Sequence, residues 1–141
     1  MPTPFLTVYD KFLIFSTDNA FLEKLTFCEQ EEILRTFLLK AVMDFDSSQI
    51  ELDYDLENKE FINELTEDEI NILAEYMNLY WVRRLLQDEE LLRKSIGDRD
   101  YTIYSPANHM KNLSEVESAI NKRVIKRVYK YSIKHVLKRG N

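Results

Sequence analysis

Residues that interrupt helices are almost absent from the interior of this chain. Its 141 residues include only two glycines and three prolines, at Pro2, Pro4, Gly97, Pro106 and Gly140. All-β folds need many turns built from glycine, proline or asparagine-glycine pairs. The sequence therefore predicts a mainly α fold: a small helical bundle with a long C-terminal helix and one irregular acidic loop or short hairpin.

Apolar residues at three- and four-residue spacing predict two amphipathic helices. Each follows a capping-box pattern, Thr26 with Glu29 and Thr66 with Glu69. The first stripe is Ile33, Leu34, Phe37, Leu38, Ala41 and Phe45. The second is Ile70, Leu73, Ala74, Met77, Tyr80, Trp81, Arg84 and Leu85. Trp81 suits both a core anchor and an interface residue, because buried tryptophan serves both purposes.

The segments before and between these helices have mixed patterns. Residues 8–15 fit a short helix capped by Thr7, and they also fit a strand. Asp18 or Asn19 is expected to begin a second short element that runs through Leu25. Residues 46–61 lose the helical period, and their alternating apolar side chains fit either a short half-buried strand or a connecting loop with a helical turn.

The chain after Leu85 is expected to contain a break and then a long helix. We expect Asp88 to cap a separate helix over 89–96 that Gly97 ends, followed by an extended loop over 98–105. Ser105 and Pro106 suit the start of the last helix, because proline is favoured at the first helical position. Its stripe is Ala107, Met110, Leu113, Val116 or Glu117, Ile120, Val124, Val128 and Tyr131.

This last helix is expected to be longer than the bundle needs. About 33 helical residues would span roughly 50 Å at 1.5 Å per residue, so the distal part is expected to project. We therefore divide the chain into a helical bundle over residues 1–120 and a basic C-terminal helical arm over residues 121–141.

Charge separates along the same division. Residues 101–141 hold nine Lys/Arg and two Glu, a formal +7, whereas residues 1–100 hold ten Lys/Arg and 23 Asp/Glu, a formal −13, which together give −6. A chain polarised in this way carries surfaces of opposite sign and is typical of proteins that bind partners.

No assembled catalytic, cofactor or metal site is visible in the sequence. His109 and His135 lie 26 residues apart without a zinc motif, and Cys28 is the only cysteine. No glycine-rich nucleotide motif is present. A calcium loop starting at Asp44 would have Gln49 where glycine is required, so a solvated acidic surface is preferred. We expect a protein that is not an enzyme, with no cofactor.

The sequence also predicts where the chain is made. A single cysteine fits a reducing, cytosolic origin. The first residues lack the basic start and cleavage site of a signal peptide. The apolar run there is far shorter than the roughly 18 to 20 residues of a membrane span. We expect no membrane association.

The basic C-terminal helix is the candidate binding element. Its basic side chains could bind the phosphates of nucleic acid. Its combination of a basic and an apolar face would also suit a membrane surface or a protein partner. A pI near 5.0 counts against a dedicated DNA-binding protein, so partner docking is favoured. The predicted partner-binding residues are Lys122, Arg123, Lys126, Arg127, Tyr129, Lys130, Tyr131, Lys134, Val136, Leu137, Lys138 and Arg139.

Three segments together resemble a known family. They are the acidic capped helix LTEDEINILA at 65–74 with Met77 and Trp81 after it, LLRKSIGDRDY at 91–101, and YSPANHM at 104–110. This combination resembles the head–tail connector (adaptor) proteins of tailed bacteriophages that infect Gram-positive bacteria. The resemblance runs from Phe12 to Tyr131, and its motifs are structural rather than catalytic.

The resemblance implies a structural virion protein of the neck, made in the host cytoplasm. Such adaptors are mostly helical and form a twelve-fold homo-oligomeric ring under the portal protein, which extends the DNA channel. Their C-terminal segment commonly reaches onto the portal. A neighbouring neck or tail protein would be a further partner, and DNA would pass through the lumen without sequence-specific binding. The alternatives are a head-closure or tail-completion protein, or a regulator that binds nucleic acid through the basic helix.

Overall fold

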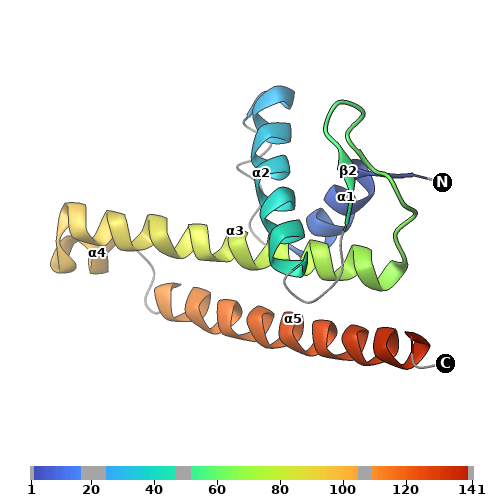
Figure 1. Cartoon of the computed structure of the whole chain (residues 1–141). Helices are drawn as coiled ribbons and strands as arrows, with labels where there is room; N and C mark the ends of the chain where they lie inside the picture. Colours follow the sequence, from blue (N-terminus) through green and yellow to red (C-terminus); the bar gives the residue numbers. More distant parts are fainter. Residues whose placement is uncertain (1, 17–24, 47–51, 105–108, 140–141) are drawn as a thin grey trace.

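The long helix α3 runs through the molecule and organises the fold (Figure 1). The computed structural model describes residues 2–16, 25–46, 52–104 and 109–139. Helices α1 and α2 pack on one side of α3, and α5 runs antiparallel to it on the other (Figure 1). The mainly α fold predicted from the sequence is confirmed. In chain order the elements are β1 (Thr3–Pro4), α1 (Phe5–Phe15), α2 (Phe27–Asp46), β2 (Tyr54–Asp55), β3 (Glu60–Phe61), α3 (Glu67–Ile96), α4 (Asp98–Tyr104) and α5 (His109–Arg139).

The hydrophobic core surrounds the first half of α3. Eleven α3 residues are buried: Ile70, Ile72, Leu73, Ala74, Glu75, Met77, Asn78, Leu79, Tyr80, Trp81 and Val82. The α2 stripe predicted from the sequence meets them with Leu34, Leu38, Ala41 and Phe45, all buried. Trp81 is 1% exposed and lies edge-on to Phe37, with 6.3 Å between ring centroids. Trp81 is therefore a core residue within this chain.

The start of α3 is the predicted capping box. The Glu69 N–H donates to Thr66 Oγ1 at 3.3 Å, and the Thr66 N–H donates to Glu69 Oε1 at 2.7 Å. These two bonds satisfy N–H groups that the first turn of a helix leaves without partners. Similarly, Thr26 Oγ1 accepts from the Glu29 N–H at 3.2 Å before α2.

The predicted break at Asp88 is wrong, because α3 continues to Ile96. The residues around Asp88 are good helix formers without glycine or proline, so an aspartate on the exposed face does not end the helix. Arg93 and Lys94 lie in the last turn, where cations are favoured, and Gly97 ends the helix with φ of 87°. The role predicted for Gly97 is confirmed.

The extended loop predicted after Gly97 is also wrong, because α4 occupies that segment. Asp98 and Asp100 lie in its first turn, where carboxylates are favoured. The Tyr101 N–H donates to the Gly97 carbonyl at 2.9 Å. Figure 1 shows α4 folded back at the C-terminal end of α3. The predicted helix start at Ser105 and Pro106 lies outside the described residues.

The N-terminal segment forms a strand and then a helix. Helix α1 begins at Phe5, so the strand alternative and the Thr7 cap are both wrong. Pro4 precedes it with φ of −65°, a value that suits entry into a helix. Buried α1 residues recur at helical spacing: Phe5, Val8, Tyr9 and Phe12. The second short element predicted over 18–25 lies almost wholly outside the described residues.

The short hairpin predicted as the alternative to an acidic loop is present, because β2 and β3 pair antiparallel in a small sheet that β1 completes. Its strand order is β1-β3-β2, and Phe61 pairs with Thr3 on one side and Tyr54 on the other. Asp55 accepts N–H bonds from Asn58 and Glu57 across the turn, and these bonds hold the pKa of Asp55 below its usual value. Leu52 is buried, but Tyr54 and Leu56 are 39% and 48% exposed, so the described part of the predicted alternation fails.

Candidate partner-binding site

Helix α5 packs along α3 through one apolar face. Ile120 and Val124 are buried, and Val128 and Tyr131 are partly buried against the same core. These four residues are the second half of the stripe predicted from the sequence, whereas Val116 in its first half is exposed. However, residues 121–134 lie along α3 and do not project from the body (Figure 1). The boundary at residue 120 stays a prediction.

Polar contacts also hold α5 on α3, and three of them lie between residues 123 and 134 of α5. The Tyr131 hydroxyl donates to Glu69 Oε2 at 2.7 Å, and its ring lies 5.4 Å from Phe45. Burial, with Glu69 and Asp68 nearby, raises the pKa of Tyr131 well above its usual value. Arg123 Nη2 lies 3.4 Å from Oε2 of Glu75, whose side chain is 4% exposed. Lys134 Nζ lies 3.4 Å from Asp68 Oδ2.

Glu69 connects the α3 cap to α5. Its Oε1 accepts from the Thr66 N–H, and its Oε2 accepts from the Tyr131 hydroxyl. One carboxylate therefore closes the first turn of α3 and holds the C-terminal half of α5. This contact sets the register in which the basic side chains of α5 are presented.

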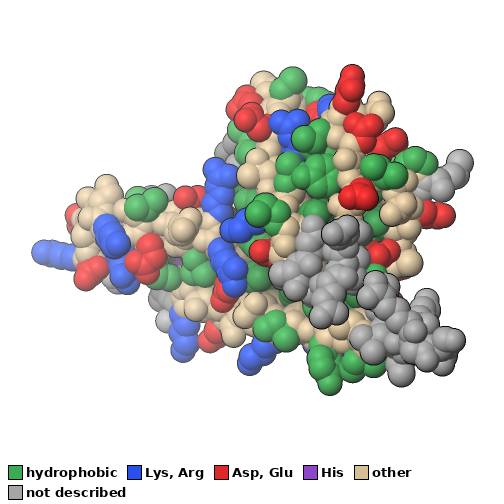
Figure 2. Space-filling model, in the orientation of Figure 1, with side chains coloured by type: hydrophobic (Ala, Val, Ile, Leu, Met, Phe, Trp, Pro, Cys, Tyr) green, Lys and Arg blue, Asp and Glu red, His purple; other side chains and the backbone are tan. Residues whose placement is uncertain are grey.

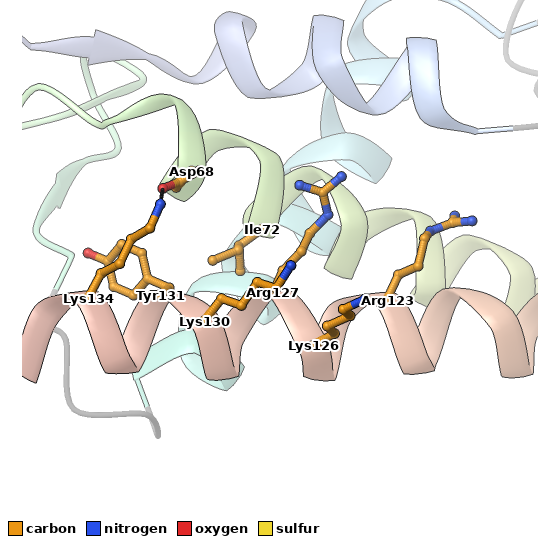
Figure 3. Close-up of a pocket in the computed structure, with 8 residues that line it drawn as sticks. All are labelled: Asp68, Ile72, Arg123, Lys126, Arg127, Lys130, Tyr131 and Lys134. Carbon is orange, nitrogen blue, oxygen red and sulfur yellow. Dashed lines mark hydrogen bonds and ion pairs between the residues drawn. The ribbon is translucent and has the colours of Figure 1, made fainter.

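A basic groove lies where α5 meets α3 (Figure 3). Its volume is about 380 Å³, and α3 contributes only Asp68 and Ile72 to it. In Figure 3 the side chains of Arg123 and Arg127 extend from α5 toward α3. The residues from α5 are Arg123, Lys126, Arg127, Lys130, Tyr131 and Lys134. We call these six residues, together with Asp68 and Ile72, the basic groove.

Three cations in the basic groove have no acidic partner. Arg123 and Lys134 are paired, but within the described parts of the chain no carboxylate lies in ion-pair distance of Lys126, Arg127 or Lys130. Lys126 and Lys130 are exposed, and Arg127 is half-buried. Guanidinium and ammonium groups held on one face bind carboxylates or phosphates. The groove is therefore a candidate site for an acidic partner.

The structure brings together half of the twelve residues predicted to bind a partner. Arg123, Lys126, Arg127, Lys130, Tyr131 and Lys134 line the groove. Lys122 and Tyr129 are exposed but do not line it. Helix α5 continues to Arg139, but the side chains of Val136, Leu137, Lys138 and Arg139 lie outside the described set.

Sequence reasoning missed the α3 side of the groove. Asp68 and Ile72 are not among the predicted partner-binding residues, and both line the groove. Glu75, which anchors Arg123, lies within the buried run of α3. The available signal was the opposite charge of two helices that are far apart in sequence. Only their antiparallel packing brings those charges together.

Metal centres and membrane spans are two other kinds of site that the described residues could form. No group of three or more His, Cys, Asp or Glu among them could hold a metal ion. Within the same residues, no helix is long and apolar enough to cross a membrane.

Comparison with known protein families, with curated proteins and with solved structures finds no match to this chain. The basic groove and the sequence resemblance are therefore the two features that bear on function.

Proposed function

We propose that this chain is a structural virion protein, a head–tail connector subunit that binds the portal protein through the basic groove. The observation that supports this proposal most is the set of three unpaired cations, Lys126, Arg127 and Lys130, on a helix that is fixed at both ends of the groove. The resemblance to connector proteins supports the identity of the partner. The acidic surface expected on that partner is what the groove would recognise.

The groove is suited to docking because it is organised before a partner arrives. Tyr131, Arg123 and Lys134 are already held by α3 carboxylates, so α5 does not have to fold or move on binding. Such preorganisation lowers the entropy lost on association. Arg127 also offers a planar group that can bind a carboxylate through two parallel hydrogen bonds.

The rest of the chain has the opposite sign. Residues 1–66 hold 14 Asp/Glu and five Lys/Arg, a formal −9. Carboxylates repel the phosphates of nucleic acid. A connector whose acidic body faced the channel would therefore let DNA pass without retaining it, while the basic groove held the portal.

Charge reversal in the groove tests this function. We expect Lys126→Glu, Arg127→Glu and Lys130→Glu together to weaken binding to the co-expressed portal protein at least about tenfold, which corresponds to about 1.4 kcal/mol. The matched control reverses Lys94, Arg99 and Lys111, three exposed cations that do not line the groove. Thermal unfolding would verify that both variants fold. Equal portal binding by the two variants would contradict the proposal.

Truncation after Ile120, at the predicted domain boundary, would be a poorer test than charge reversal. It would remove Val124, Val128 and Tyr131 and expose the core side of α3. Loss of binding would then report damage to the fold. Charge reversal leaves those side chains in place.

Binding of nucleic acid is the second candidate, because the same three cations suit phosphates. Gel shifts across a range of salt concentrations would separate the two functions, since phosphate contacts weaken steeply with salt. DNA binding that is lost in the groove variant, together with unchanged portal binding, would favour this alternative. A neck head-closure or tail-completion role would show as binding to a neighbouring neck or tail protein in place of the portal.

A further inference from the structure

Helix α5 carries a second apolar face that the fold leaves exposed. Ile125, Tyr129 and Ile133 recur every four residues and are 61%, 66% and 42% exposed. Residues at this spacing are neighbours on one side of a helix, and this side is opposite the face that Val124 and Tyr131 pack on α3. Figure 2 shows hydrophobic side chains along the surface formed by α5. We call these three residues the outer stripe.

An apolar groove lies on the other side of the molecule, between α1 and α2. Its volume is about 330 Å³. Leu6, Leu13 and Phe27 line it and are 62%, 42% and 77% exposed. Asp10, Glu31 and Lys59 supply its charged border. We call this site the α1–α2 groove.

The outer stripe cannot reach the α1–α2 groove of its own chain. Helix α3 lies between them, with α1 and α2 on one side and α5 on the other (Figure 1). The bonds from Tyr131 to Glu69 and from Arg123 to Glu75 hold α5 in that position. Any contact between the two surfaces is therefore a contact between two copies.

We propose that the outer stripe of one copy docks in the α1–α2 groove of a second copy. A helix whose apolar residues enter a hydrophobic groove is a recurrent mode of recognition. The lengths match: the stripe covers nine residues and the α1 wall from Leu6 to Leu13 covers eight, which correspond to about 12 and 10 Å along the helix axis at 1.5 Å per step.

The charges around the two surfaces also match. Lys122 is exposed beside the outer stripe, on a helix whose residues 109–139 hold nine Lys/Arg and two Glu. The α1–α2 groove belongs to residues 1–66, whose formal charge is −9. Asp10 is exposed there, and among the described residues it has no cation in ion-pair distance. Opposite charges at the border favour this pairing over stripe against stripe, which would bring lysines together.

The contact joins two different surfaces, so each copy keeps one of each kind free. Such heterologous interfaces build closed rings or open filaments. The interface would supply the subunit contact of the ring, and in that respect it depends on the proposed function. It uses a different face of α5 from the basic groove, so one copy can hold its neighbour and an acidic partner together.

Two complementary variants test the pairing with this chain alone. Tyr129→Glu disables the stripe, and Phe27→Glu disables the groove; both side chains are exposed, so the fold should be retained. In sedimentation velocity we expect the wild-type chain to form concentration-dependent oligomers, each variant alone to stay monomeric, and their mixture to form dimers only. Leu91→Glu, at a 63% exposed residue of α3 outside both surfaces, is the control and should associate normally.

The same experiment contains the outcomes that overturn the pairing. A wild-type chain that stays monomeric at the highest attainable concentration overturns it. Self-association of the Phe27→Glu variant also overturns it, because a stripe-to-stripe dimer would not need the groove. Neither result bears on portal binding through the basic groove. Conversely, loss of portal binding after charge reversal in the basic groove does not bear on the self-association measured here.

Cross-linking gives an independent check, because Cys28 is the only cysteine, is exposed and follows Phe27. We would mix wild-type chain with a differently tagged Cys28→Ser chain that carries either Lys122→Cys or Ser132→Cys, near opposite ends of the stripe. Under mild oxidation we expect one of these to form a mixed disulfide dimer more abundantly than either homodimer. The control chain carries Cys28→Ser with Leu91→Cys. If neither the Lys122→Cys nor the Ser132→Cys chain gave more mixed disulfide dimer than this control, the pairing would be overturned.

Discussion

The two halves of α3 have different surroundings. From Ile70 to Val82 the helix has α1, α2 and α5 around it, and all eleven of its buried residues lie there. From Arg83 to Ile96 no residue is buried. In Figure 1 this second half extends beyond α2 and carries α4 at its end. One continuous helix therefore belongs to the core over part of its length and to the surface over the rest.

The second half is held mainly by polar contacts. Glu89 accepts from the Tyr101 hydroxyl at 2.5 Å and lies 3.5 Å from His109 Nε2. Arg93 contacts Glu90 at 3.1 Å and Asp98 at 3.7 Å. Exposed contacts of this kind are individually weak. The comparison indicates that global stability is concentrated in the first half and that the second half opens locally.

The largest expected difference is between Trp81 and Leu91, one apolar residue from each half. Trp81→Ala should lower the free energy of unfolding by about 3 to 5 kcal/mol, because it opens a large cavity in the core. Leu91→Ala should change it by less than about 0.5 kcal/mol, because Leu91 is already exposed. Chemical denaturation measures both values. Equal effects would show that the second half is also part of the cooperative core.

Loss of an ion pair should also lower the free energy of unfolding more in the first half of α3 than in the second, although both losses should be smaller than that of Trp81→Ala. Arg123→Ala leaves the buried Glu75 carboxylate without its partner and should cost about 1 to 3 kcal/mol, near the lower value because Arg123 itself is 52% exposed. Arg83→Ala removes a 3.0 Å contact with Glu117 in the second half and should cost no more than about 1 kcal/mol. Denaturant midpoints compare the two, and a larger loss for Arg83 would reverse the assignment.

The cap of α3 should contribute a smaller amount and should be coupled to α5. Thr66→Ala is expected to cost about 1 kcal/mol, because the Glu69 N–H loses its acceptor. Tyr131→Phe removes the other contact of Glu69. Because both act on Glu69, one at its backbone N–H and the other at its carboxylate, the double variant should differ from the sum of the single ones. Additive effects would show that the cap and α5 are independent.

The first half of α3 was predictable because its signals are local. Both bonds of the Thr66 capping box, the stripe from Ile70 to Trp81 and the helix end at Gly97 can be read from neighbouring residues. The errors are in the second half. An aspartate at position 88 suits a cap, but a cap needs the backbone to leave the helix, and nothing in that segment makes it leave. Helix α4 depends on Tyr101 reaching Glu89, a contact that appears only after the chain turns back.

The candidate site was likewise predictable only where its signals are local. The basic residues of α5 could be listed from the sequence, because their spacing on one helix is local information. Which of them lack partners could not be listed. Arg123 and Lys134 are paired with Glu75 and Asp68, which are 48 and 66 residues away. Lys126 and Arg127 between them have no such partner among the described residues. That distinction depends on the packing of α5 on α3.

The smallest expected effect on global stability belongs to Glu89, and it tests the comparison most sharply. Glu89→Gln weakens the contacts with Tyr101 and His109 but touches nothing buried, so the free energy of unfolding should change by less than about 0.5 kcal/mol. Hydrogen exchange in α4 and the last turns of α3 should nevertheless become faster, because this carboxylate joins α3 to both following helices. Amides from Ile70 to Val82 should be unaffected. Glu90→Gln, which touches only Arg93 among the ion pairs described, is the matched control. If exchange in the first half accelerated equally, the two halves would open as one unit, and the contrast between them would be one of burial alone.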